Sequence, residues 1–409
     1  MTFRPWPALA ALIAALALPG CLRVNVHGDP DAYIRSMTPL RVATYNTSLY
    51  DERAGGLVRR LRDGDARASA VAAVLQRVRP DIVLLNEFDH DAAHQAADLF
   101  QQRYLAVPQA GGGDAIHYPY RYLAPVNTGV PSGLDLDRDG QARTGDSGDR
   151  ARGNDAWGYG LHPGQYGMLV LSRFPIDVQA VRTFQKLKWS AMPDARQPID
   201  PVTGRPWYPA AVWSQLRLSS KSHWDVPVRT PRGTLHLLAS HPTPPVFDGP
   251  EDRNGARNHD EIRLWREYLS APNASWLCDD SGTCGGLPAD ATFVIAGDLN
   301  ADPHDGDGHR GAIRGLLSHP RVNDAVVPRS VGATVAAAGH GLQRVGDTGS
   351  HTGDFGPRVG TLRLDYVLPS SDLLPIGSGV HWPPPGAPEA EAANASDHRL
   401  VWVDLLMPR

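Results

Sequence analysis

Six short polar motifs border apolar stretches of strand length, and their side chains are of the kinds that bind metal ions and move protons. They contribute Asn46, Glu87, His241, Asp298 with Asn300, Asp365, and Asp397 with His398. Carboxylate and amide oxygens are ligands that Mg²⁺, Mn²⁺ and Ca²⁺ prefer, whereas zinc favours imidazole and thiolate. Histidines beside carboxylates add acid and base capacity near neutral pH. A set of this composition suits the magnesium-assisted hydrolysis of phosphate esters.

The elements that must position these motifs are strands and helices of a layered protein. The apolar stretches cover residues 40–45, 81–85, 235–240, 293–297, 362–368 and 400–405. Continuous apolar runs are typical of strands that are buried on both faces of an α/β sheet. Apolar residues at helical spacing predict one helix over 66–78, before Arg79-Pro80, and a second over 258–269. A single aspartate after a strand is more often a turn or capping residue, so the functional interpretation depends on six such motifs recurring.

In their order along the chain, the motifs resemble the endonuclease/exonuclease/phosphatase family. The resemblance rests on Thr44-Tyr45-Asn46, Asn86-Glu87, His241, Gly297-Asp298-Leu299-Asn300, Asp365-Tyr366 and Ser396-Asp397-His398. The Gly-Asp-Leu-Asn and Ser-Asp-His pieces are the most specific, and the resemblance covers residues 38–407. Asn86 stands where the family usually has glutamine. The resemblance implies a DNase I-like α/β fold, a four-layer sandwich of two packed mixed β-sheets flanked by helices.

The resemblance also implies a role for each motif. Glu87 would bind Mg²⁺ or Mn²⁺, with Asn46 and Asp397 close by. Asp298 and Asn300 would orient or activate the attacking water. His398, paired with Asp365, would act on the nucleophile or the phosphate, and His241 would act on the leaving group. Such a metal offsets the charge that develops on the phosphate, while a positioned base prepares water for attack.

Two stretches without regular periodicity are interpreted as insertions that frame a cleft. Residues 108–165 are rich in Gly, Asp and Arg, and residues 186–232 contain several Pro and Trp. Loops of this length in a compact domain tend to be functional or mobile. The stretch 160–176 resembles the central strand of the family, and Tyr166 at its start is either a phosphate contact or a tyrosine at the edge of the core. We expect Arg173, with Arg121 and Arg152, to form a local basic cleft that binds one phosphodiester.

A second acidic cluster lies within the first insertion. Asp135, Asp137 and Asp139 alternate before Gly140, and Asp146 follows Asp135 by eleven positions. This pattern matches the first half of an EF-hand calcium loop, although no flanking helices are evident. The cluster is therefore either a structural Ca²⁺ site or a solvated acidic loop.

The N-terminus and the cysteines indicate export from the cytoplasm. An apolar run from Trp6 to Leu18 leads into Leu18-Pro19-Gly20-Cys21, which resembles a bacterial lipoprotein signal. We predict a signal peptide over residues 1–20, lipidation of Cys21 and a linker over 21–37. Plain secretion and a buried N-terminal helix are the alternatives. Cys278 and Cys284 bracket a polar loop, which in an exported protein predicts a local disulfide, because two thiolates alone do not complete a zinc site.

Length and charge restrict the function further. The 409 residues are 42% hydrophobic and 21% charged, which suffices for one large domain over 38–407. A net charge of −4 argues against a protein that coats nucleic acid through its phosphates. We therefore expect a monomeric, metal-dependent phosphodiesterase of nuclease-like type that acts outside the cytoplasm. The alternatives are a phospholipid or sugar-phosphate phosphoesterase of the same family, and a catalytically silent binding protein.

Overall fold

Two β-sheets packed face to face form the centre of the fold in the computed structural model, which describes residues 39–145 and 148–407. The strands are β1 Leu40–Leu49, β2 Ile82–Phe88, β3 Tyr120–Tyr122, β4 Met168–Ser172, β5 Arg182–Thr183, β6 His223–Thr230, β7 Gly233–Ser240, β8 Phe293–Asp298, β9 Gly353–Asp354, β10 Thr361–Leu362, β11 Asp365–Pro369, β12 Leu374–Val380 and β13 Val401–Leu406. One sheet has the order β12-β13-β1-β2-β4-β3 and the other has the order β11-β8-β7-β6-β5. Both are mixed, because β1 pairs with β2 and β7 pairs with β8 in parallel, while their other neighbours are antiparallel.

Helices of very different length accompany these strands. The α-helices are α3 Gly56–Asp63, α4 Ala66–Val78, α5 Gln95–Phe100, α6 Arg150–Asn154, α7 Ala210–Trp213, α8 Arg253–Ser270, α9 Arg310–Leu317, α10 Val331–His340, α11 Gly356–Val359 and α12 Ala390–Ala393. Single turns of other helix types are η2 Gln101–Leu105, η3 Val178–Ala180, η4 Trp189–Ala191 and η5 Thr348–Ser350. None of the helices in the described ranges combines the length and the apolarity needed to span a membrane.

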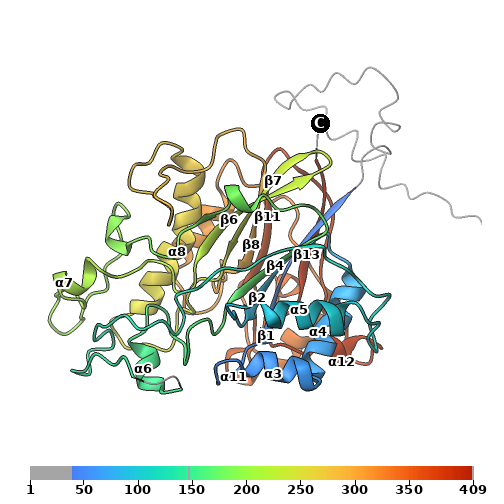
Figure 1. Ribbon diagram of the computed structural model, residues 1–409, viewed down its shortest axis with the longest axis horizontal. Coiled ribbons are helices and arrows are strands. Elements are labelled where there is room, and N and C mark those ends of the chain that lie inside the picture. The colour runs from blue at the N-terminus through green and yellow to red at the C-terminus, as the bar shows by residue number, and fades with distance from the viewer. Residues whose placement is uncertain (1–38, 146–147, 408–409) are drawn as a thin grey trace, which may run out of the picture. The chain divides into compact units, whose positions relative to one another are not determined.

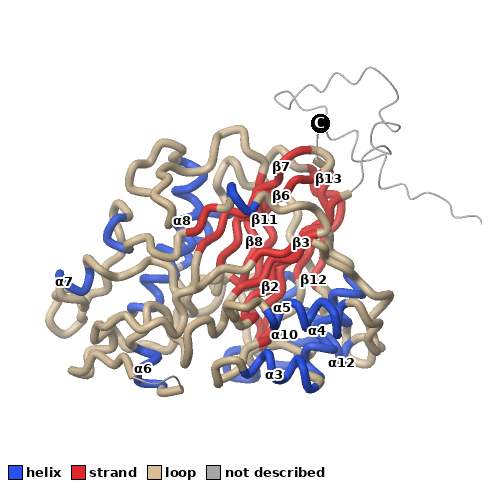
Figure 2. Tube along the Cα trace, in the orientation of Figure 1, coloured by secondary structure: helices blue, strands red, loops and turns tan. Residues whose placement is uncertain are grey.

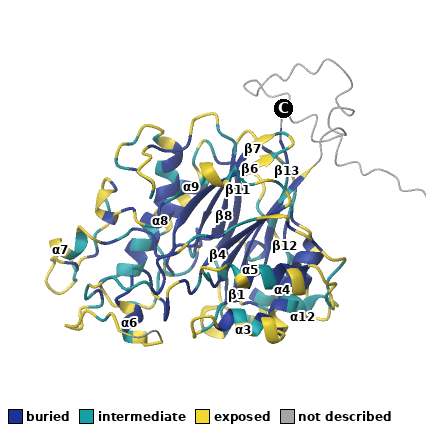
Figure 3. Cartoon of the chain, viewed as in Figure 1, coloured by how far each residue is buried: buried dark blue, intermediate teal, exposed yellow. Residues whose placement is uncertain are grey.

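Three apolar cores show how the layers pack. Because side chains alternate along a strand, Ile82 and Leu84 of β2 enter the core between the sheets, whereas Val83 and Leu85 pack against α3, α4 and α5. On the other side, α8 and α9 pack on the second sheet through a separate core. The strands accordingly lie between two groups of helices (Figures 1 and 2) and are buried along most of their length (Figure 3). These are the four layers that the sequence motifs predicted, so the fold prediction is confirmed.

The two predicted helices are both present. Helix α4 has the predicted bounds, because the Asp65 side chain accepts the Ala68 N–H at its start and Arg79 adopts a left-handed conformation at its end. Helix α8 begins at Arg253, five residues before the predicted start, and ends at Ser270. Its first turn is polar and contains Gly255, so apolar periodicity does not reveal it.

The second predicted insertion is shorter than expected, because its last part is β6. Trp224, Val226 and Val228 alternate into the core between the sheets. Pro227 lies inside this strand, and a proline normally argues against a central strand. Here the Pro227 carbonyl accepts the Asp177 N–H on the side away from β7, so the missing N–H of Pro227 faces the same side and leaves the β6–β7 ladder intact. The first insertion likewise contains a strand, β3.

The remaining predictions about the ends of the chain and the cysteines have different outcomes. Cys278 and Cys284 form a disulfide, as predicted. The predicted signal peptide, the linker over 21–37, Cys21 and Asp146 lie outside the described residues.

Candidate active site

The topology brings the six predicted motifs to one end of the paired sheets. Asn46 and Glu87 lie near the carboxyl ends of the parallel strands β1 and β2, and Asp298 ends β8, the parallel neighbour of β7. His241 follows the last residue of β7. Asp365 starts β11, which runs antiparallel to β8 and places Asp365 directly opposite Asp298. His398 precedes β13, which runs antiparallel to β1, so it arrives at the same end.

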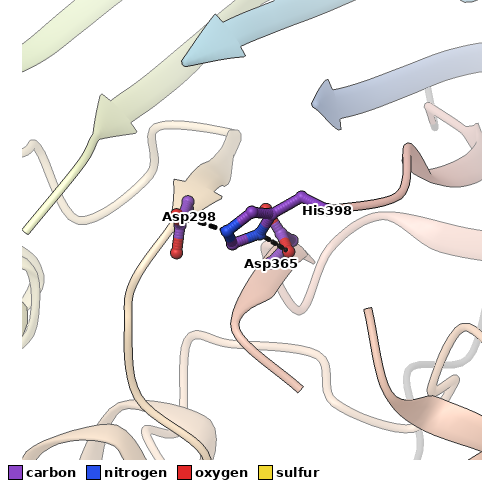
Figure 4. A group of neighbouring side chains, drawn as sticks. All are labelled: Asp298, Asp365 and His398. Carbon is purple, nitrogen blue, oxygen red and sulfur yellow. Dashed lines mark hydrogen bonds and ion pairs between the residues drawn. The ribbon is translucent and has the colours of Figure 1, made fainter. Parts of the chain in front are cut away.

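The centre of the site is His398, held between two buried carboxylates (Figure 4). Its Nδ1 lies 2.8 Å from Oδ2 of Asp365, and its Nε2 lies 3.5 Å from Oδ2 of Asp298. Burial opposes the charge on His398, but Asp365 and Asp298 outweigh burial and raise the pKa of His398 well above its usual value. Burial also raises the pKa of Asp365. The ring is therefore an imidazolium at neutral pH.

Asp298 gathers donors from several elements. Its Oδ2 accepts the Asn46 amide at 3.0 Å and lies 3.4 Å from Nε2 of His241, while its Oδ1 accepts the Asn300 N–H at 2.9 Å. Burial raises the pKa of Asp298, but His398 and His241 outweigh burial, and the net pKa falls below its ordinary value. Burial, aided by the charge of Lys221, lowers the pKa of His241 to about 4. The site thus combines an ionised Asp298 with a neutral His241 and a charged His398.

Glu87 and Asp397 offer the carboxylates for a metal ion. Both line a cavity, and neither has an ion-pair partner within 4.0 Å among the described residues. Glu87 has a left-handed backbone with φ of 55°, and burial raises the pKa of its side chain to about 7. Two carboxylates without an ion-pair partner within 4.0 Å, beside the Asn46 amide, form an oxygen-only donor set, which fits Mg²⁺ or Mn²⁺. The Asp298–Asp365–His398 cluster fits a metal less well, because carboxylates already face both ring nitrogens.

A cavity of about 710 Å³ opens beside these carboxylates. Its wall includes residues of both predicted insertions, among them Tyr159 and Trp189. Tyr166 lies on the wall with its ring centroid 4.6 Å from that of Tyr50. Tyr166 therefore lies on the wall of the cavity that Glu87 also lines, and its contact with a phosphate stays a prediction.

Lys221 is a cavity residue that the sequence interpretation missed. It is only 6% exposed, and no ion pair within 4.0 Å or hydrogen bond of its ammonium is found among the described residues. Burial lowers the pKa of Lys221, whereas the carboxylates of Glu261 and Glu87 raise it. Lys221 stands among small polar residues of the second insertion, just before β6, and nothing in that pattern distinguishes it from an exposed lysine.

Two predicted site residues have surroundings other than those expected. The Asn300 side chain lies at the site, but its amide donates to the Pro242 carbonyl at 3.1 Å. Arg173 lies at the opposite end of the first sheet, where it pairs with Asp81 at 2.8 Å. Asp81 precedes β2, and Glu87 lies near the other end of that strand. At the rise of an extended strand, the two residues are about 20 Å apart. The structure therefore does not bring Arg173 to the site, because β4 runs antiparallel to β2 and carries it away.

The predicted basic cleft is not formed by its other members either. Arg121 pairs with Asp98, and the buried guanidinium of Arg152 donates to the carbonyls of Leu161 and Gly129. Both guanidinium groups are used by contacts within the fold, so they do not form the predicted phosphodiester site.

The acidic loop of the first insertion is arranged differently from the predicted calcium loop. Asp135 and Asp137 group with Asp155, which the motif did not include. Asp139 pairs with Arg143. In this loop, the carboxylates close enough to one another to share a cation are therefore those of Asp135, Asp137 and Asp155.

Comparison with known proteins gives the family. An endonuclease/exonuclease/phosphatase from Beutenbergia cavernae DSM 12333 is similar at 18% identity and a TM-score of 0.46, covering 90% of this chain and 72% of that one. Sphingomyelinase C from Streptomyces griseocarneus is similar at 18% identity and a TM-score of 0.41, covering 90% and 99%. No curated protein matches the sequence significantly. The family model described as Endonuclease/Exonuclease/phosphatase family matches residues 43–398, and the chain therefore belongs to this family of phosphoester hydrolases.

Proposed function

We propose that this chain is a divalent-cation-dependent phosphodiesterase that acts outside the cytoplasm. The observation that carries the proposal is the position of Glu87 and Asp397, two carboxylates that form no ion pair within 4.0 Å among the described residues. They line a cavity directly beside the Asp298–His398–Asp365 group. A catalytically silent binding protein has no need for an imidazolium between two buried carboxylates, an arrangement that is costly to build.

Each residue of the site has a separate role in the proposed hydrolysis. A cation bound by Glu87, Asp397 and Asn46 would offset charge on the phosphate oxygens. Asp298, ionised and fixed by the Asn46 amide, accepts a hydrogen bond from the attacking water and orients it. His398 keeps Asp298 ionised and positions it, while Asp365 holds the ring through Nδ1. His241 is neutral and lines the cavity, and its Nε2 faces Asp298, so its single N–H helps to hold that carboxylate in place beside the substrate.

The charges along the cavity favour a diester over a monoester. Arg150 pairs with Glu52, Arg253 pairs with Glu251, and Arg257 donates to backbone carbonyls. Lys221 is thus the one cavity-lining cation of the described residues without such a partner. A single ammonium beside the metal site matches the single negative charge of a phosphodiester.

An exposed aromatic side chain on the cavity wall favours a phospholipid as a second candidate substrate. Phe247 is 87% exposed, although it lines the cavity. An exposed aromatic ring beside a polar site suits contact with a lipid surface. The predicted lipid on Cys21 would hold the enzyme near such a surface, and the proposed extracytoplasmic location depends on that N-terminal segment.

The experiment is a substrate screen with the purified full chain. The assay contains Mg²⁺, Mn²⁺ or Ca²⁺ and offers plasmid DNA, sphingomyelin vesicles, a chromogenic phosphodiester and a chromogenic phosphomonoester. We expect faster turnover of diesters than of the monoester and no turnover in EDTA. Preference for the monoester would contradict the diester assignment, and turnover of nothing would favour the binding protein.

A further inference from the structure

A second group of metal-binding side chains lies away from the cavity. Asp302 and Asp305 belong to the loop between β8 and α9, and His351 lies between η5 and β9. One carboxylate oxygen of each aspartate and one ring nitrogen of His351 all lie within 4.8 Å of one another. None of the three lines the active-site cavity.

The two carboxylates are buried and form no ion pair among the described residues. Asp302 is 6% exposed and Asp305 is 9% exposed, and neither has an ion-pair partner within 4.0 Å among residues 39–145 and 148–407. The nearby Arg344 guanidinium donates to the Val359 carbonyl and to neither carboxylate. Backbone N–H groups, including those of Arg363 and Gly346, fix both aspartates. Burial raises the pKa of Asp305, but the N–H groups of Val345 and Gly346 and the charge of Arg344 outweigh burial and lower it. No cation contacts either carboxylate among the described residues, whereas buried charges in proteins are normally paired or bound to metal.

His351 supplies an independent sign of a missing ligand. The ring is 1% exposed, and its Nδ1 lies 2.7 Å from Oγ1 of Thr361. Its Nε2 is buried and has no hydrogen-bond partner among the described residues. Burial lowers the pKa of His351, so the ring is neutral near pH 7. If Nδ1 donates to Thr361, Nε2 carries the lone pair, which is how metal-binding histidines are usually oriented.

We propose that Asp302, Asp305 and His351 bind one divalent transition-metal cation of the Zn²⁺ or Mn²⁺ type. Two carboxylates with one imidazole suit such an ion, whereas Ca²⁺ and Mg²⁺ prefer oxygen ligands alone. The ion would offset both buried carboxylates and use the orphaned nitrogen. Asp302 follows Asn300 by two residues and accepts the N–H of Arg363, two residues before Asp365. The site therefore ties together the two segments that carry Asp298 and Asp365, and its role is to hold them in register.

The test measures metal content and does not depend on turnover. The full chain is stripped with EDTA, dialysed against Zn²⁺ and desalted, and bound zinc is counted by mass spectrometry in the wild type, His351→Ala, Glu87→Gln and the double variant. We expect His351→Ala to lose one equivalent of zinc whether or not Glu87 is changed. His381→Ala is the matched control, because its Nε2 is also buried without a partner but it belongs to no such cluster among the described residues. It should retain the full zinc content.

A second variant covers the case in which His351→Ala fails to fold. Asp305→Asn keeps the shape of the side chain, and we expect it to lose the same equivalent and the Zn²⁺-induced rise in Tm. Cobalt substitution of the wild type should give a visible absorption band that Asp305→Asn lacks. The proposal is overturned if both variants bind as much zinc as the wild type, or if Glu87→Gln alone removes all of it. Because these readouts need no substrate, failure of the proposed phosphodiesterase function leaves them unaffected.

Discussion

Nδ1 of His398 lies 2.8 Å from Oδ2 of Asp365, although 33 residues separate them in the chain. The pair forms because β11 and β13 belong to different sheets whose ends meet, so that the first residue of β11 faces the residues that precede β13. The other ring nitrogen faces Asp298. The histidine thus links Asp298, which we propose to orient the attacking water, to Asp365 on the other side of the ring.

Loss of this link should reduce turnover without unfolding the protein. We expect His398→Ala, His241→Ala and Asp298→Asn each to lower kcat about a hundredfold or more. His236→Ala is the matched control, because His236 also pairs with an aspartate, Asp225, at 2.7 Å, but it lies on β7 outside the cavity. It should keep wild-type kcat on the best diester of the screen. Near-wild-type activity in all three site variants would show that the assigned roles are wrong.

The metal concentration that hydrolysis requires should depend on Glu87. EDTA should abolish hydrolysis, and Glu87→Gln should raise the metal concentration needed for half-maximal rate at least tenfold, because it removes the charge of one ligand. The measurement is initial rate against Mg²⁺ or Mn²⁺ concentration. Glu391→Gln, a change of an exposed carboxylate on α12, is the control and should leave the curve unchanged. Full activity in chelator would contradict the metal-dependent mechanism.

Loss of the Lys221 charge should reduce the hydrolysis of a phosphodiester more than it reduces the stability of the protein. Lys221→Met keeps the length of the side chain and removes its charge, and we expect kcat/KM for a phosphodiester to fall about tenfold or more. Lys186→Met, at an exposed lysine of the same insertion, should change nothing. Steady-state kinetics and a thermal melt of each variant are the measurements. A variant that loses only stability and not kcat/KM would assign Lys221 to the core.

The buried imidazole of His223 should make the protein sensitive to acid. Burial lowers the pKa of His223 to about 4 in the folded chain, against about 6.5 when unfolded. Between these values the unfolded chain binds a proton that the folded chain does not, so stability is complete above about pH 6.5 and falls as the pH drops toward 4. His223 alone should contribute a slope of about 1.4 kcal/mol per pH unit. Urea unfolding of the wild type and His223→Gln from pH 4.5 to 7 measures it, and an unchanged slope in the variant would refute the assignment.

Attachment to a membrane should depend on Cys21. Cys21→Ser should move the protein from the membrane fraction to the soluble fraction, since each buried CH₂ of an acyl chain contributes about 0.8 kcal/mol to anchoring. Cys278→Ser keeps Cys21, and that variant should stay in the membrane fraction. Western blots of fractionated cells give the result. Unchanged fractionation of Cys21→Ser would leave plain secretion or a retained N-terminal helix.

The family, the four layers and most of the candidate site residues could be predicted from the motifs and their resemblance to a known family. Buried strands such as β2 and β8 read as continuous apolar runs, and a helix such as α4 shows both its periodicity and its cap. The motifs with Asp298 and His398 are short and local, so their residue types alone identify them. Local signals of this kind can be recognised in a sequence before anything is known about tertiary packing.

Which of the predicted residues lie together depends on the packing of the folded chain, which no motif reveals. The antiparallel course of β4 carries Arg173 to the far end of the sheet, and a sequence does not state the direction of a strand. Lys221 became a site residue only when its burial beside Glu87 was known. The unpartnered Nε2 of His351 and the closeness of its ring to Asp302 and Asp305 likewise depend on contacts between segments more than 40 residues apart. The burial of a side chain, its protonation state and its hydrogen-bond partners depend on residues that are distant in the sequence. A local sequence pattern does not encode them.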